Sequence, residues 1–187
     1  MIPDLAEIVR AIKGTLRLAR FDATALADFD RSYDGFWRSF FAAALAAPAY
    51  FALVALRLPH DQEMTLDRFL VELGGYVVSW LAYPYAVIFL VRLVDRTEHY
   101  FDYMVPYNWA VVLQVFLLLF LAVLTHAGIV PPRPAVLLET IAVIAIMIFQ
   151  GFIARTGLLI SVPHAVAFVA IDLLLNLIIA RLVQALA

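Results

Sequence analysis

The chain has 187 residues, of which 65% are hydrophobic and 15% are charged, and its net charge is −2 at pH 7. A soluble domain typically holds about 25% charged and about 45–50% apolar residues, so this composition excludes an ordinary water-soluble domain. Cysteine is absent, which excludes disulfides, thiolate metal sites and a cysteine nucleophile. The sequence has no long basic block, and we expect no nucleic-acid partner.

Residues 1–36 predict an amphipathic, helical N-terminal region. Over residues 3–20, apolar side chains recur on one face at helical spacing, namely Leu5, Ile8, Val9, Ile12, Leu16 and Ala19. A basic stripe follows the edge of this face and consists of Arg10, Lys13, Arg17 and Arg20. The pattern favours a helix on the inner leaflet with its basic side chains at the lipid headgroups. The alternative is a helix packed on the cytoplasmic face of the protein itself.

Five apolar segments follow, and each holds 18 to 24 residues. That length crosses a hydrocarbon core of about 30 Å at about 1.5 Å per residue. We place the spans at residues 39–56, 69–91, 109–130, 135–154 and 157–180. The sequence therefore predicts an all-α, polytopic integral membrane bundle, in which residues 37–187 form a domain of five transmembrane helices.

Three connections between the spans carry signals of their own. Residues 95–108 combine acidic and aromatic side chains, which is typical of a segment at headgroup level. Residues 131–134 include three prolines and predict a stiff outer corner. Residues 155–157 leave room only for a very short inner turn between antiparallel helices.

The distribution of basic residues predicts the sidedness of the chain. With the N-terminus inside, nine basic residues lie on the inner side and four on the outer side. The excess of arginine over lysine, together with abundant alanine and leucine, is associated with GC-rich bacterial genomes. We therefore expect a multi-pass protein of the bacterial inner membrane, with a cytoplasmic N-terminus and a periplasmic C-terminus.

Polar residues within the spans form two predicted layers. An ionisable group at the centre of a span costs about 2.5–3.5 kcal/mol, so each one needs a partner or a function. The outer half holds Glu72, His126, Glu139, Asp172 and Asn176. The inner half holds Gln114, Gln150 and His164, which we interpret as an interhelical hydrogen-bonding layer. The outer group fits either a proton or cation site, or a structural network in which acids pair with His126, Arg133 or Arg181.

The segment before the third span offers a weaker candidate site, made of Glu98, His99 and Asp102. One histidine among acids is a poor metal signal, because zinc usually takes more nitrogen or sulfur ligands. Two other interpretations are an enzyme that acts on lipid headgroups and a solvated helix end with Arg92 and Arg96 as counter-charges. The sequence contains no serine-hydrolase elbow, P-loop, dinucleotide fingerprint or HExxH motif. We predict a non-enzymatic protein without a metal or another cofactor.

Two functions from different classes fit this sequence. The first is an accessory, assembly or scaffold subunit of a membrane complex, whose partners are the lipid bilayer and a second copy or another membrane protein. The alternative is a small oligomeric transporter or channel, whose pathway uses Glu139, Asp172, Asn176 and His126. A water-accessible cavity that reaches Asp172 favours transport, whereas a closed bundle with paired acids favours the accessory role.

Overall fold

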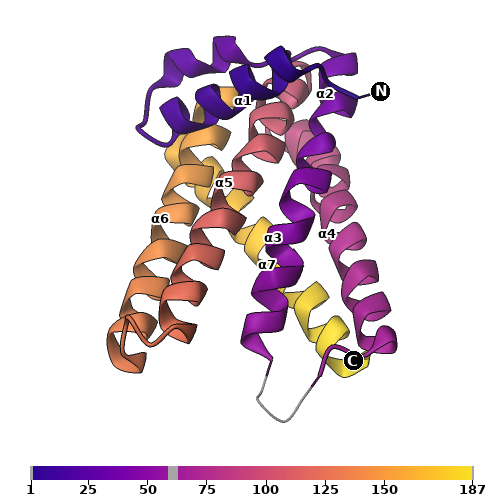
Figure 1. Ribbon diagram of the computed structural model, residues 1–187. Helices are drawn as coiled ribbons and strands as arrows, with labels where there is room; N and C mark the ends of the chain where they lie inside the picture. The colour runs from indigo at the N-terminus through magenta and orange to yellow at the C-terminus, as the bar shows by residue number, and fades with distance from the viewer. Residues whose placement is uncertain (1, 59–62, 187) are drawn as a thin grey trace.

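The computed structural model describes residues 2–58 and 63–186, and every regular element within these ranges is helical. Three short elements come first: α1 (Leu5–Leu18), the 3-10 helix η1 (Ala23–Asp28) and α2 (Tyr33–Ser39). The long helices are α3 (Phe41–Arg57), α4 (Leu66–Leu93), α5 (Tyr100–His126), α6 (Pro132–Leu158) and α7 (Val162–Leu186), with the 3-10 helix η2 (Thr97–His99) before α5 (Figure 1).

Five helical segments in the described part of the chain are long and apolar enough to cross a membrane. The first of them runs from Tyr33 to Arg57, so α2 and α3 together form one span. This confirms the predicted all-α architecture of five spans behind short N-terminal helices. The protein is therefore a multi-pass membrane protein in contact with a lipid bilayer.

The helix α5 lies at the centre of the bundle and packs along α3 on one side and α6 on the other. The helix α7 crosses behind them and packs on both α6 and α4 (Figure 1). We call the end of the bundle that carries α1, η1 and α2 the capped end, and the opposite end the far end. The described chain begins at the capped end and finishes at the far end (Figure 1).

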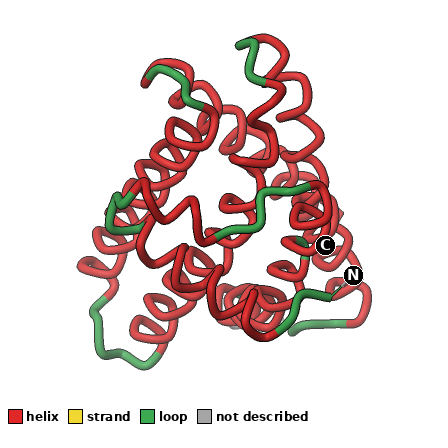
Figure 2. The backbone as a smooth tube through the Cα atoms, turned by 90° about the horizontal axis from the view of Figure 1, so that it is seen from above, coloured by secondary structure: helices red, strands yellow, loops and turns green. Residues whose placement is uncertain are grey.

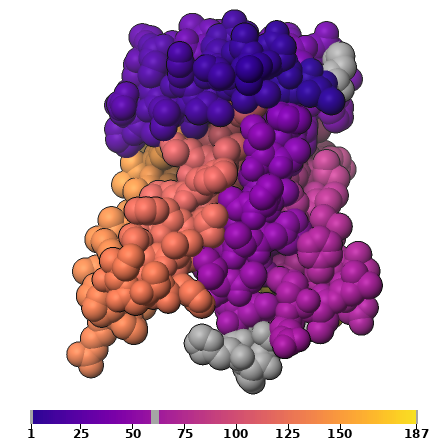
Figure 3. All heavy atoms as spheres, viewed as in Figure 1, coloured from indigo at the N-terminus to yellow at the C-terminus, as the bar shows by residue number. Residues whose placement is uncertain are grey.

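The elements α1, η1 and α2 form a cap across one end of the bundle. Figure 2 looks down on this cap, and Figure 3 shows it covering the ends of the long helices. The helix α1 begins where the Asp4 carboxylate accepts a hydrogen bond from the Glu7 N–H at 2.6 Å. A Cβ added at Gly14 would lie 2.8 Å from the Phe29 ring, so a glycine allows the cap to close here.

Ion pairs hold the cap together. Arg17 of α1 pairs with Asp22 at 2.8 Å and with Asp28 at 2.6 Å. Arg38, near the end of α2, pairs with Glu7 at 2.9 Å and so ties α1 to the first spanning segment. The N-terminal region is thus a folded part of the molecule and not a loose tail.

The third spanning helix begins earlier than the sequence predicted. We placed residues 95–108 in a headgroup-level connection, but α5 starts at Tyr100, and Tyr103, Tyr107 and Asn108 are buried. The physical reason is that the hydroxyls of Tyr103 and Tyr107 and the Nδ2 atom of Asn108 find hydrogen-bond partners inside the bundle. Aromatic and polar residues from Tyr100 to Asn108 therefore belong to the buried start of a helix, and not to the connection between spans.

The predicted inner turn at residues 155–157 is also helical. The helix α6 continues to Leu158, and the residue that caps its end, Leu159, has a left-handed φ of 53°. A Cβ at Gly157 would lie 2.9 Å from the Asp102 carbonyl oxygen. Because Gly157 has no side chain, α6 can pack closely on the start of α5.

Candidate functional site

A buried carboxylate lies in the middle of the bundle. Asp172 is the eleventh of the 25 residues in α7, and only 4% of it is exposed. The turns on either side of it are almost entirely apolar. Ionisable residues inside transmembrane helices are rare, and each is a functional-site hypothesis by default.

Three neutral side chains surround the Asp172 carboxylate. The Tyr107 hydroxyl from α5 donates to Oδ1 at 2.9 Å, and the Asn176 amide, one turn along α7, donates to the same oxygen at 2.9 Å. The Gln150 side chain of α6 is the third hydrogen-bonding partner of this carboxylate. Among the residues that the structure describes, no arginine, lysine or histidine lies within ion-pair distance of this carboxylate. The site supplies dipoles but no counter-charge.

A cavity of about 210 Å³ adjoins Asp172 where α4, α5, α6 and α7 meet. Two atoms of its lining residues, Asn108 Oδ1 and Gln114 Nε2, are buried and have no hydrogen-bond partner in the described part of the chain. Such an atom costs about 1–3 kcal/mol, so this lining suits a polar guest. The volume is below the about 300–1,000 Å³ of small-molecule sites, which favours water or a small cation over an organic substrate.

The side-chain amides of Asn108 and Gln114 each form one hydrogen bond within the protein through their other polar atom. Asn108 Nδ2 donates to Ser39 Oγ at 2.8 Å, and Gln150 Nε2 donates to Gln114 Oε1 at 3.3 Å. These bonds join α5 to the first span and to α6. They fix the orientation of each amide, so Asn108 is left with an acceptor and Gln114 with a donor that no other described residue engages.

A row of buried tyrosines leads from Asp172 toward the capped end. The rings of Tyr107 and Tyr83 lie 4.8 Å apart between centroids. The hydroxyls of Tyr83 and Tyr103 share a hydrogen bond of 2.6 Å, and the Tyr83 hydroxyl also lies 3.3 Å from the Phe168 carbonyl oxygen. Tyr103 is in the first turn of α5, so hydroxyl groups extend from the cavity region to the start of that helix.

The predicted outer-half cluster divides in the structure. Asp172 and Asn176 line the central cavity together. Glu72 is buried on α4 and accepts a hydrogen bond from the Tyr50 hydroxyl at 3.3 Å. Glu139 is 37% exposed by side chain and pairs with Arg57 at 3.6 Å. His126 is exposed in the last turn of α5. These last three residues do not contribute to the Asp172 site.

The predicted inner-half layer also divides. Gln114 and Gln150 bond to each other and line the Asp172 cavity, so they belong to the same site as Asp172. His164 is exposed in the first turn of α7, where its Nδ1 lies 3.1 Å from Ser161 Oγ.

Sequence reasoning missed Tyr107 and Asn108 as site residues, because it placed them in a connection between spans. A signal was present in the chain. Tyr103, Tyr107 and Gln114 follow one another at intervals of four and seven residues, which is the spacing of one helix face. Extending the third span toward the N-terminus would have placed these polar side chains on a buried stripe.

The weaker candidates converge at the capped end as an ion network. His99 Nδ1 lies 2.8 Å from Asp102 Oδ2, and His99 Nε2 lies 3.7 Å from Glu98 Oε1. Arg31 of the cap pairs with Asp102 at 3.0 Å. Within the described ranges, no group of three or more His, Cys, Asp or Glu side chains is arranged to hold a metal ion. The visible role of this network is to fasten the cap to α5.

The basic stripe of α1 is split between two environments. Arg10, Lys13 and Arg20 are exposed. Hydrogen bonds to Asp22 and Asp28 engage Arg17 and raise its pKa, while hydrogen bonds from Thr24 and Arg17 lower the pKa of Asp22. Arg17 therefore stabilises the cap, and the other three basic side chains lie exposed on the surface.

The apolar face predicted for α1 is divided, because Ile8 and Ala19 pack against the core while its other members lie outside. Leu5, Val9, Ile12 and Leu16 are exposed, whereas Ala11, Thr15 and Leu18 are buried. The cap thus presents an apolar stripe beside exposed basic groups.

Comparisons of the chain with protein-family models, with curated proteins and with solved structures find no match.

Proposed function

We propose that this protein is a small, non-enzymatic transporter or channel of the bacterial inner membrane, which binds a proton or a small monovalent cation at Asp172. One observation carries the proposal: a buried carboxylate with only neutral partners among the described residues adjoins a cavity lined by Asn108 and Gln114, each of which has one buried polar atom without a partner there. A bundle of five helices is thin for transport, so the working form is proposed to be a homo-oligomer.

The charge of the Asp172 carboxylate requires neutralisation. A buried acid that only stabilises a fold is usually neutralised by an arginine, lysine or histidine. Here hydrogen bonds from Tyr107 and Asn176 orient the Asp172 carboxylate but leave its charge in place. Neutralisation must come from a proton or an added cation, and a site that changes charge on loading is the requirement for coupled movement across a membrane.

The experiment is a flux measurement in liposomes that enclose either a pH-sensitive or a sodium-sensitive dye, driven by a potassium diffusion potential or a sodium gradient. The wild type is expected to exceed empty liposomes, Asp172→Asn to fall to that background, and Glu139→Gln to keep wild-type flux. Equal flux in folded Asp172→Asn and wild type would reject the assignment of Asp172. No flux by the wild type would reject the transport class.

A second candidate is the accessory or scaffold subunit, and the exposed stripe of α1 favours it. An apolar face on the outside of a well-fastened cap suits contact with another membrane protein or with the lipid surface. The test is purification in mild detergent, with quantification of stoichiometric companions. Ile12→Gln should remove a companion that binds this stripe, and Gly74→Ala, a change on α4 at a position with open space, should retain it.

The sidedness of the chain is part of the proposal. The excess of basic residues on the N-terminal side supports a cytoplasmic cap and a periplasmic C-terminus. Reporter tags on the two termini should read opposite compartments, and tags that read the same compartment would reject this arrangement.

A further inference from the structure

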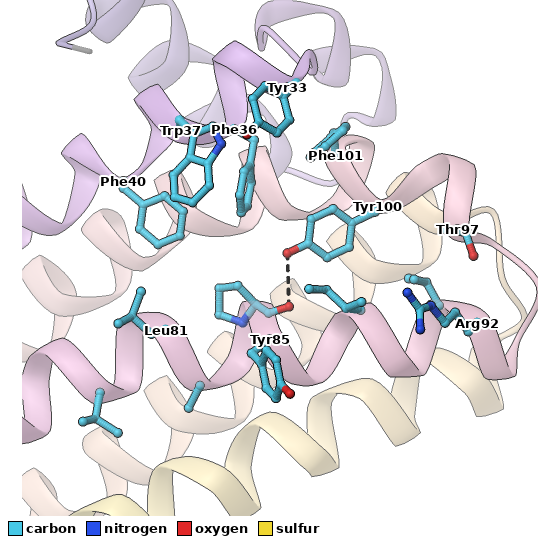
Figure 4. A pocket seen from close by; sticks show the side chains of 15 residues that line it. Tyr33, Phe36, Trp37, Phe40, Leu81, Tyr85, Arg92, Thr97, Tyr100 and Phe101 are labelled. Atoms are coloured by element: carbon cyan, nitrogen blue, oxygen red, sulfur yellow. Dashed lines mark hydrogen bonds between the residues drawn. The ribbon is translucent and has the colours of Figure 1, made fainter.

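The outer surface of α4 carries a second, larger hollow, which the proposed function does not use. This groove has a volume of about 810 Å³ and lies between α2, with the following Phe40, and α4, and η2 and the start of α5 lie at one end. Figure 4 shows the aromatic side chains of Phe36, Trp37 and Phe40 facing α4, with Tyr100 and Phe101 beside them. On α4, Val78, Leu81 and Tyr85 are exposed, so the groove opens to the outside of the bundle.

The walls of the groove are aromatic and braced. Phe36 is buried, and its ring lies 5.5 Å from Tyr100 and 5.3 Å from Trp37 between centroids. The Tyr100 hydroxyl donates to the Pro84 carbonyl at 3.1 Å and holds α5 against α4 (Figure 4). The groove is therefore formed by packed rings and a hydrogen bond, which gives it a fixed shape.

The capped end of the groove is polar and positively charged. Arg92, in the last turn of α4, and Thr97 of η2 line this end. The Arg92 guanidinium lies 5.9 Å from the centre of the Phe89 ring. No carboxylate within the described ranges lies at ion-pair distance from Arg92. An arginine in this setting suits a phosphate group, which it can hold by two parallel hydrogen bonds.

The length of the groove matches one membrane leaflet. From Val78 to Arg92 the helix advances about 21 Å at about 1.5 Å per residue. One leaflet contributes about 15 Å of hydrocarbon, and the headgroup region lies beyond it. If Leu81 lies within the hydrocarbon, Arg92 therefore lies at the level of the headgroups.

We propose that this groove binds one phospholipid from the surrounding leaflet, with its phosphate at Arg92 and Thr97 and an acyl chain along Trp37 and Leu81. The bilayer is the solvent of this surface, and the phosphodiester is the anion that it supplies at that depth. The charge at one end and the apolar, aromatic walls along the remainder match the two parts of that molecule. The volume of about 810 Å³ is within the about 300–1,000 Å³ of specific ligand sites.

The test is a titration of the delipidated protein in detergent with dioleoyl phosphatidylglycerol, in which native mass spectrometry counts the bound copies. Arg92→Gln removes the phosphate contact, and Leu81→Trp fills part of the groove with a larger, aromatic side chain. Arg155→Gln and Leu137→Trp are matched controls, because Arg155 borders a different surface hollow between α6 and α7 and Leu137 is an exposed leucine on α6. Glycerol phosphate without acyl chains is the competitor that represents a soluble phosphate.

We expect one high-affinity copy on the wild type and at least a tenfold weaker first binding step in both groove variants, since a hydrogen bond to a charged group accounts for such a factor. Both controls should bind like the wild type, and glycerol phosphate should not compete. Equal loss in Arg92→Gln and Arg155→Gln would show general annular binding and overturn the proposal. Unchanged binding in folded Leu81→Trp would overturn it as well, and so would full competition by glycerol phosphate.

Discussion

The Tyr107 hydroxyl donates to Asp172 Oδ1 at 2.9 Å and thereby bridges α5 and α7. These two helices are not closely packed neighbours, because α5 packs mainly on α3 and α6, and α7 packs on α4 and α6. The bond therefore crosses the interior of the bundle at the cavity itself. A change at either residue alters both the polar site and the attachment of α7.

Replacement of Tyr107 by phenylalanine should destabilise the protein. The ring contact with Tyr83 is retained, while Asp172 loses a buried donor, so we expect the free energy of unfolding to fall by about 1–3 kcal/mol. Thermal unfolding in detergent, followed by circular dichroism, measures this as a shift of about 2–4 °C for each kcal/mol. Tyr85→Phe is the control because Tyr85 is 65% exposed and should stay within about 0.5 kcal/mol of the wild type. Equal midpoints for the two variants would contradict the importance of this bond.

Alanine at Gly157 should be destabilising by about 1–3 kcal/mol, because the added Cβ would meet backbone atoms of Asp102 and Tyr103 at 2.9 Å. Backbone atoms of a helix cannot move aside as a flexible side chain can. At Gly74 an added Cβ meets nothing within 4 Å, so alanine there should be neutral or stabilising by up to about 1 kcal/mol. Unfolding midpoints of the two variants provide the comparison, and the reverse order would refute the packing argument.

The cap should lose stability in acid. Hydrogen bonds from Thr24 and Arg17 lower the pKa of Asp22 below its usual 3.8. A carboxyl with a lowered pKa in the folded state contributes stability above its unfolded pKa, and this contribution disappears as pH falls through the folded value. An asparagine at this position would keep the helix cap but has no charge to lose, so Asp22→Asn isolates the ion pair.

We therefore expect the midpoint difference between wild type and Asp22→Asn to be present at pH 6 and to close as pH falls below 3.8. The difference should be small, because both Arg17 and Asp22 are more than a third exposed. A difference that widens in acid would show that the ionised Asp22 carboxylate does not stabilise the folded state.

Glu139→Gln should change little. Its pair with Arg57 spans 3.6 Å, and both side chains are substantially exposed, so the expected loss is below about 1 kcal/mol. Unfolding midpoint and liposome flux should both match the wild type. A loss of flux in this variant would return Glu139 to the transport pathway, where the sequence alone had grouped it with Asp172.

The fold was predictable because hydropathy over a whole span is a signal carried by consecutive residues. The pairing of Asp172 with Asn176 was predictable for a similar reason, since residues four apart share one face of a helix. The bond between Gln114 and Gln150 required only that two amides occur at similar depth on neighbouring helices.

The position of Asp172 relative to the other acids was not predictable from these signals. The fifth span was placed at residues 157–180, whereas α7 runs from Val162 to Leu186. A displacement of five or six residues moves a side chain by about 8 Å along the helix axis. That is enough to transfer Asp172 from the group of Glu139 and His126 to the level of the glutamines. The partner of Glu72, Tyr50, depends on the rotation of two helices about their axes, which no single segment encodes.

The fastening of the cap has a consequence for biogenesis. Arg31 and Asp102 form an ion pair although 71 positions separate them in the chain. Since domains form from the N-terminus as the ribosome elongates the polypeptide, Arg31 is synthesised well before its partner. The Arg31–Asp102 pair therefore cannot form until the chain has been synthesised through the first turn of α5, after the first two spanning segments. The pairs of Arg17 with Asp22 and of Arg38 with Glu7 need only the N-terminal region, so attachment of the cap to α5 is a later step than formation of the cap itself.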